Sequence, residues 1–213
     1  MDIRLKTLRS GFDFQTCLVV PCAAISDDRS LALLTMTRLD INGSDVFDGS
    51  YGMTSRDGGA TWSEPEKWSA FGRRPNEYGG TSCLSGFPFW HQASKTMLAF
   101  PDIINYTPDN VVDLKNPRCM AFTRRDAATG LWSEPSLLEV REDMRRDYVL
   151  SGRRMEECDN GDILLPLSAM SLPGFIGVTH IARVRIDGTK AHIVEYGSPL
   201  DQVRQPRGLY EPT

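Results

Sequence analysis

Two short segments carry the side chain types best suited to chemistry. Trp90 and His91 are adjacent in the segment FPFWH. An indole face stacks on sugar rings and an imidazole exchanges protons, so the pair predicts a sugar-binding site. A structural loop histidine is the alternative for His91. Glu156 and Glu157 resemble a catalytic carboxylate pair in type, but adjacent strand residues point to opposite faces, which argues against one shared substrate.

The cysteine and glycine patterns argue against several other kinds of site. The five cysteines are odd in number and form no CxxC pair, which argues against a disulfide framework and a zinc site. The sequence has no His-x-x-Glu-His motif, Asp-rich metal loop or phosphate-cradling glycine motif. We therefore expect no metal and no cofactor.

Free thiols favour a reducing compartment, and thus a cytoplasmic location. A signal peptide is the alternative, with Lys6 and Arg9 ahead of the apolar run 17–24. That run is short, and it is also suited to a first strand.

Composition narrows the class of partner. The 213 residues have a net charge of -4 and no basic tract, so we expect no nucleic acid partner. No stretch approaches the roughly 18 apolar residues of a membrane helix, so we expect no membrane partner.

The elements that must position these residues are predicted to be strands. Short apolar or alternating runs end in turn residues such as DGG and DNGD, a pattern typical of all-β proteins. The one helix candidate, 137–148, is highly charged. The predicted strands are 16–25, 31–37, 49–55, 96–100, 119–123, 163–167, 180–186 and 191–196.

Two segments repeat each other and indicate a repeat architecture. TSRDGGATWSEP at 54–65 matches TRRDAATGLWSEP at 123–135, and a weaker third copy surrounds Asp187. The spacing is roughly 60–70 residues, enough for four strands and their connections.

The first copy carries the complete Asp-box pattern S-x-D-x-G-x-T-W. Its residues are Ser55, Asp57, Gly59, Thr61 and Trp62. The aspartate can accept hydrogen bonds from its own turn, and glycine supplies a positive φ. We therefore predict a structural hairpin here, and a different turn in the second copy around Asp126 and Trp132, which lacks the Gly-Gly pair.

With these motifs the chain resembles the sialidase and BNR (Asp-box) repeat superfamily of six-bladed β-propellers, which often cleave glycosides. The likeness includes VVP at 19–21, SGRRMEECDNGDILLP at 151–166 and RGLYEPT at 207–213. It implies an all-β, sialidase-like β-propeller of about three blades of a six-bladed ring. The blades are expected at roughly 12–70, 71–140 and 141–205, with a fourth beginning at 206–213. A missing C-terminal half or a second chain would then close the ring.

The resemblance also implies site residues. Arg38 matches a family arginine that binds the substrate carboxylate. Asp45 lies where the acid/base aspartate is expected, with Asp48 as the alternative, and Glu211 matches the glutamate that activates a tyrosine nucleophile. Ordinary exposed carboxylates are the competing interpretation of Asp45 and Glu211. Val19 occupies the place of another family arginine and cannot donate to a carboxylate, which argues against authentic sialidase activity.

Three functions remain open at this point. The first is a sialidase-like glycoside hydrolase that acts on a terminal sugar and is inactive as this fragment. The second is a non-catalytic carbohydrate- or protein-binding propeller, since Asp boxes stabilise propellers without a catalytic role. The third is a lyase or another carbohydrate-active enzyme on the same scaffold. All but the protein-binding variant predict a carbohydrate ligand.

Overall fold

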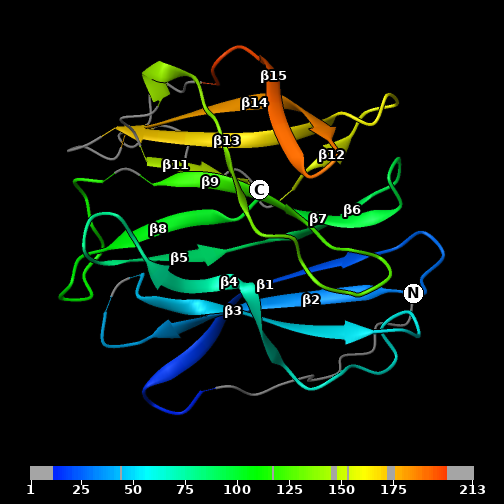
Figure 1. Ribbon diagram of the computed structural model, residues 1–213, viewed down its shortest axis with the longest axis horizontal. Helices are drawn as coiled ribbons and strands as arrows, with labels where there is room; N and C mark the ends of the chain where they lie inside the picture. Colours follow the sequence, from blue (N-terminus) through cyan, green and yellow to red (C-terminus); the bar gives the residue numbers. More distant parts are fainter. Residues whose placement is uncertain are drawn as a thin grey trace.

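The computed structural model describes residues 12–43, 45–116, 118–144, 148–152, 154–171 and 176–200. There the chain forms antiparallel strands and one 3-10 helix, η1 (Glu142–Met144) (Figure 1). None of the helical structure in these ranges has the length and apolar character needed to cross a membrane.

The first group of strands is the first four strands of a ten-stranded antiparallel sheet that continues into the second group. Its strands pair in chain order: β1 (Thr16–Ile25), β2 (Ala32–Asp40), β3 (Phe47–Ser55) and β4 (Glu66–Pro75). β1 is interrupted by a bulge between Val19 and Cys22, where Val20 has φ +54°. Pro21 has no N–H to give to a ladder, so the irregularity falls where the sequence requires one.

The second group has the same antiparallel up-and-down plan, but two of its strands are each broken into two elements. Its elements are β5 (Thr81–Ser85), β6 (Pro88–His91), β7 (Thr96–Ala99), β8 (Asp102–Tyr106), β9 (Cys119–Arg124) and β10 (Ser136–Leu138). β5 pairs with β8 and β6 with β7, while β9 pairs with both β7 and β8. Pro101 separates β7 from β8, because proline cannot donate to the ladder. Residues Arg73–Pro75 of β4 pair with β5 and link the first two groups.

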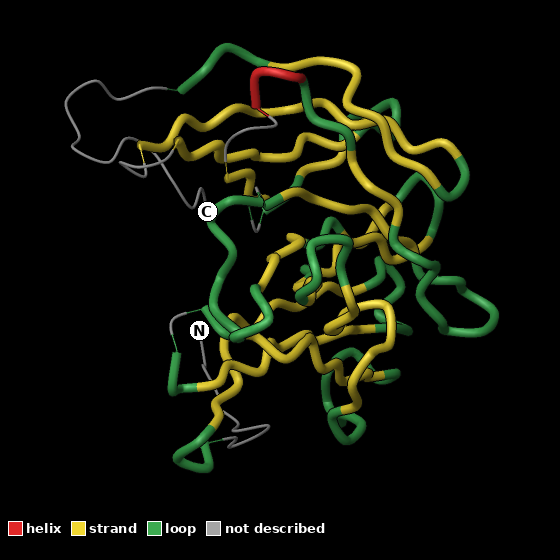
Figure 2. Tube along the Cα trace, turned by 60° about the vertical axis from the view of Figure 1, so that its left-hand side comes forward, coloured by secondary structure: helices red, strands yellow, loops and turns green. Residues whose placement is uncertain are grey.

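The third group is a separate sheet. It consists of β11 (Tyr148–Ser151), β12 (Glu156–Glu157), β13 (Ile163–Ser171), β14 (Ile176–Asp187) and β15 (Lys190–Tyr196). β11 and β12 both pair with β13, and β14 lies between β13 and β15. Figure 2 shows these strands as a layer of their own, with η1 above them.

Apolar side chains fill the spaces between the groups. The largest cluster joins the second and third groups and includes Phe100, Phe122, Leu165 and Val184. A smaller cluster joins the first and second groups around Leu33, Phe71 and Met97, with Trp68 and Trp132 against it. Each group of strands thus buries an apolar face against the next, and separate clusters of the described residues fill the successive spaces.

The all-β prediction is confirmed. The predicted first strand has the observed bounds of β1, whereas β4, β5, β6, β8 and the short strands β10–β12 were not predicted. These missed strands are short, interrupted by proline or rich in polar residues, so they lack a clear period of two. The blade boundaries drawn from the sequence stay a prediction.

Candidate functional site

We call the first, second and third groups of strands the first, second and third blades. The loop between β2 and β3 places Asp45 at one end of the first blade. In Figure 1 this is the left-hand end, toward which β2 and β8 point. Asp45 has φ +57°, a left-handed conformation that aspartate tolerates better than most residues. Its side chain is 54% exposed, so the carboxylate is open to a ligand.

Residues of the second blade hold this loop. The buried Tyr106 hydroxyl donates to the Asp45 carbonyl oxygen at 2.6 Å and accepts the Phe47 N–H at 3.0 Å. The Arg118 guanidinium, only 9% exposed, lies 3.4 Å from the Asp45 carboxylate. The aspartate is therefore fixed through both its backbone and its side chain.

Arg73 completes the support beneath the loop. Its guanidinium carbon lies 4.0 Å from the centre of the Tyr106 ring, and its Nε donates to the Phe47 carbonyl at 2.6 Å. Burial raises the pKa of Tyr106 to about 12, so its hydroxyl stays a neutral donor at physiological pH. Tyr106, Arg73 and Arg118 were missed by the sequence analysis, because no local motif marks residues that act across two blades.

Arg38 and Asp48 lie on the same end of the first blade but pair with each other. Arg38 Nη1 is 3.8 Å from Asp48 Oδ2, and Lys67 Nζ is 3.1 Å from the same oxygen. A hydrogen bond with Tyr51 is the main cause that raises the pKa of Arg38. Asp48 thus faces two cations.

The register of β1 and β2 also places Val19. Val19 is opposite Thr37, while Leu18 is opposite Arg38. Side chains alternate along a strand, so Val19 and Arg38 project to opposite faces of the sheet at this point. In this register Val19 therefore does not share a face of the sheet with Arg38.

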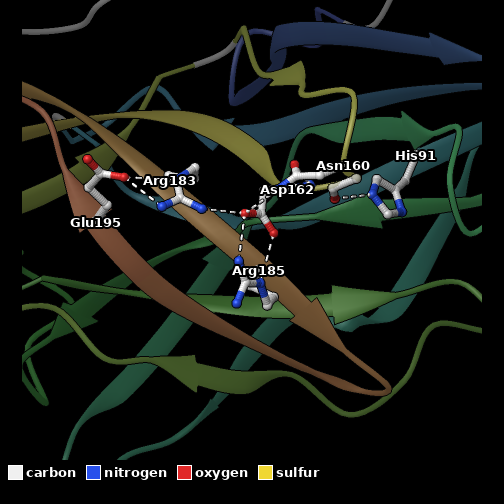
Figure 3. A network of polar contacts seen from close by, with 7 residues as sticks. His91, Asn160, Asp162, Arg183, Arg185 and Glu195 are labelled. Atoms are coloured by element: carbon white, nitrogen blue, oxygen red, sulfur yellow. Dashed lines mark hydrogen bonds and ion pairs between the residues drawn. The ribbon is translucent and has the colours of Figure 1, made fainter.

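His91 and Trp90 lie at the opposite end of the blades from Asp45. His91 is 3% exposed, and its ring nitrogens contact the Ser94 hydroxyl at 2.6 Å and the Gly161 carbonyl at 2.8 Å. Because a carbonyl only accepts, Nε2 carries a proton in this arrangement. Both nitrogens are thus occupied by protein, and the histidine links the second blade to the third (Figure 3).

A carboxylate next to this link organises two arginines (Figure 3). The 4% exposed side chain of Asp162 accepts from Arg183 Nη1 at 2.6 Å and from Arg185 Nε at 3.0 Å. Arg183 also pairs with Glu195 at 2.6 Å. The hydrogen bond from Arg185, reinforced by those from Arg183 and Asn160, holds the pKa of Asp162 well below its ordinary value.

We expect Asp162→Asn to lower the melting temperature by roughly 5 °C at pH 7. The folded-state pKa is below the unfolded value, so this contribution is present above about pH 4 and is lost as the pH falls further. The gap between wild type and variant should therefore narrow between pH 4 and pH 2 in thermal unfolding followed by circular dichroism. Asp159→Asn changes an exposed carboxylate of the same turn and is the matched control, with a shift below about 1 °C.

The Asp-box residues form a local network after β3. Asp57 accepts from the Thr61 N–H at 2.9 Å and from its hydroxyl at 2.6 Å. Ser55 Oγ donates to Asp57 and accepts the Gly59 N–H, both at 2.8 Å. Trp62 Nε1 donates to the Gly59 carbonyl at 3.0 Å. The hydrogen bond from the Thr61 hydroxyl is the largest cause that lowers the pKa of Asp57 to about 2.

The second copy forms a different turn. Asp126 accepts the N–H groups of Ala128 at 3.1 Å and Thr129 at 2.7 Å, and Gly130 supplies a φ of +74°. Trp132 lies on the first blade, with its ring 5.6 Å from Trp68 and 5.0 Å from Phe71.

The structure does not bring all the predicted site residues together. The loop between β2 and β3, which carries Asp45, and the adjoining strand ends, which carry Arg38 and Asp48, lie at the left-hand end of Figure 1. The β6–β7 hairpin, whose first strand ends in Trp90 and His91, and the turns after β3 and β9 lie at the right-hand end. Glu211 lies outside the described residues. Among those residues, no three His, Cys, Asp or Glu side chains gather as a metal site would require.

Comparisons with known proteins give structural matches only. Neither the protein-family models nor the curated protein sequences match this chain. An ulvan lyase of polysaccharide lyase family 25, solved with -[GlcA(1-4)Rha3S]-, is 16% identical with a TM-score of 0.53, over 90% of this chain and 44% of that one.

Two further structures match at a similar level. A leech intramolecular trans-sialidase is 11% identical with a TM-score of 0.56, over 93% of this chain and 53% of its own. A family 117 glycoside hydrolase of the marine bacterium Zobellia galactanivorans is 13% identical with a TM-score of 0.55, over 87% and 59%. The chain thus spans about half the length of these proteins. At such low identity the likeness shows the fold, a sialidase-like β-propeller represented by about three blades.

Proposed function

We propose that the protein is a sialidase-like glycoside hydrolase of the BNR (Asp-box) kind that removes a terminal sugar, with Asp45 as its acid/base. The geometry of the Asp45 loop carries this proposal. The Tyr106 hydroxyl holds the backbone carbonyl of Asp45, and the Arg118 guanidinium lies beside its half-exposed carboxylate. The three structural matches support it, since each is an enzyme named for action on carbohydrate.

The chemistry asks for a positioned carboxyl group. Glycoside hydrolysis needs an acid that protonates the leaving oxygen, within hydrogen-bond reach of it. Asp45 offers that reach because its side chain faces solvent while its backbone is fixed. Arg38 would bind a polar group of the sugar, and Glu211 would activate a nucleophile, as the family resemblance implies.

Sialic acid is not the sugar that we propose. A sialoside carboxylate wants planar guanidinium donors, and position 19 supplies a valine instead. We also propose a cytoplasmic location, which the five free cysteines support, since such thiols persist in reducing compartments.

A non-catalytic carbohydrate- or protein-binding propeller is the second candidate. The ion pairs of Asp48 with Arg38 and Lys67 favour the binding protein, because they engage the second carboxylate at the Asp45 end of the blade. Such pairs stabilise a rigid surface and do not require a reaction.

A panel of 4-methylumbelliferyl glycosides separates the two candidates. We expect a longer protein that contains this chain and the missing half of the ring to hydrolyse at least one neutral or acidic glycoside and to leave the sialoside intact, and the 213-residue fragment alone to hydrolyse none. Saturable binding to an oligosaccharide without hydrolysis of any glycoside would reject the hydrolase and favour the binding protein. Hydrolysis of the sialoside would reject our argument from Val19.

A further inference from the structure

A pocket of about 440 Å³ lies between the first and second blades. Its lining comes from the β1–β2 turn, the turn after β3, the β6–β7 hairpin and the segment after β9. All of these are at the right-hand end in Figure 1. The nine-residue strand β3, on the order of 25 Å long, separates this end from the Asp45 loop. The pocket is therefore distinct from the proposed catalytic site.

Arg125 is the most unusual residue of this pocket. It is 9% exposed, and its Nε is buried without a hydrogen-bond partner. Its backbone is firmly placed, since its N–H donates to the Met97 carbonyl at 2.8 Å. No carboxylate in the described part of the chain forms an ion pair with it. Glu66 and Asp126 act on it only through the longer-range attraction of their charges. A buried cation without an anion in direct contact is costly, so the site is suited to an anion that comes from outside.

The neighbouring charges strengthen this preference. Arg56 lines the same pocket and has no hydrogen bond or ion pair within the described ranges. Burial first, and the charge of Arg56 second, lower the pKa of Arg125. Asp27 and Asp28 also line the pocket: Asp27 lies 3.5 Å from Lys95, which balances its charge, whereas Asp28 accepts from Ser26 and Ser30 and stays a carboxylate. With Arg56, Lys95 and Arg125 against these two carboxylates, the lining keeps an excess of one positive charge. The guanidinium groups of Arg125 and Arg56 are consequently suited to binding one anionic group of a ligand.

Trp90 adds an aromatic side chain to the same wall. It is half-buried, and its Nε1 donates to Gln92 at 3.3 Å. An aromatic face beside cations suits a ring that carries apolar C–H groups and an acidic substituent. The volume of the pocket falls within the range of small-ligand sites.

We propose that this pocket binds an acidic sugar unit, with Arg125 and Arg56 on its carboxylate or sulfate group and Trp90 against its ring. The site is independent of the proposed hydrolase activity, because it uses none of the residues around Asp45.

Calorimetric titration with methyl glucuronide, a glucose sulfate and methyl glucoside tests the proposal. We expect saturable binding of one or both acidic probes and none of the neutral one. Arg125→Met and Arg56→Gln should each weaken binding at least tenfold. Lys115→Gln, which removes an exposed cation at the other end of the blades, is the matched control and should bind as the wild type does.

The variants also report on the fold and on the kind of ligand. Arg125→Met should not lower the melting temperature, because the charge that it removes has no partner. Exposed Arg56 can be changed without touching the core, so it tests binding even if Arg125→Met unfolds. The carboxylate and sulfate probes distinguish the two sources of the anion. Equal binding by both variants and wild type, or no binding to wild type, would overturn the site. Inorganic sulfate that binds as tightly as the sulfated sugar would overturn its assignment to a sugar.

Discussion

In a protein that completes the ring, Asp45→Asn should lower kcat on the best glycoside substrate by roughly 10²–10⁴-fold, with a smaller change in KM. An amide keeps the volume of the side chain but cannot deliver a proton to the leaving oxygen. The backbone of the loop should stay in place, because Tyr106 contacts the carbonyl of residue 45 and not its side chain. Steady-state kinetics and thermal unfolding of the same preparation measure the two effects.

Asp48→Asn is the matched control for this variant. It lies three residues further along the same loop and strand, and it pairs with Arg38 and Lys67. We expect it to retain most of the kcat of the wild type. If Asp48→Asn abolished turnover while Asp45→Asn left it intact, the acid/base role would pass to Asp48 and the proposal for Asp45 would be wrong.

Trp132→Ala should lower the free energy of unfolding by roughly 2–4 kcal/mol. The indole of Trp132 comes from the second blade but packs on Trp68 and Phe71 of the first. Its loss would open a cavity between two sheets, and the surrounding side chains could close it only in part. Urea unfolding of the folded protein measures the change.

Trp62→Ala provides the comparison, because Trp62 holds the same position in the first repeat. Its Nε1 donates to the Gly59 carbonyl within its own turn, and Trp62 belongs to none of the apolar clusters that the described residues form. We expect a loss below about half of that for Trp132. Equal losses would show that both tryptophans act within their own hairpins, and the interblade role of Trp132 would be refuted.

The two ends of the blades are suited to different tasks. At the Asp45 end, buried groups of the second blade hold a carboxylate that faces solvent. At the other end, the contact between His91 and Gly161 joins the second and third groups of strands, and the pairs around Asp162 lie within the third sheet. The Arg125 pocket is the exception there, since its cation is buried without an ion pair among the described residues.

Much of the local structure could be predicted from the sequence. The hydrogen bonds of Asp57 reach only Ser55 and Thr61, so a short motif contains all of their partners. The same holds for the apolar run that forms β1, whose alternation and flanking turns are visible in one dimension. The repeated Trp-Ser-Glu-Pro segment also indicated more than one blade.

The candidate sites depend on contacts that the sequence does not reveal. Arg118 is 73 residues from Asp45, and Tyr106 is 61 residues from it, yet both contact it across two blades. His91 meets Gly161 over 70 residues, a contact between two groups of strands that no local pattern shows. Arg125 follows β9 and is buried by the packing of separate groups of strands, which its sequence neighbours do not reveal.

By itself, the sequence determined the all-β class, the first strand and the hydrogen bonds of the Asp-box turn, because these follow from alternation and from partners within a few residues. Only the tertiary structure decided which carboxylate is positioned and which buried cation has no ion pair among the described residues. Burial and long-range pairing arise when separate sheets pack together, and no single segment encodes them.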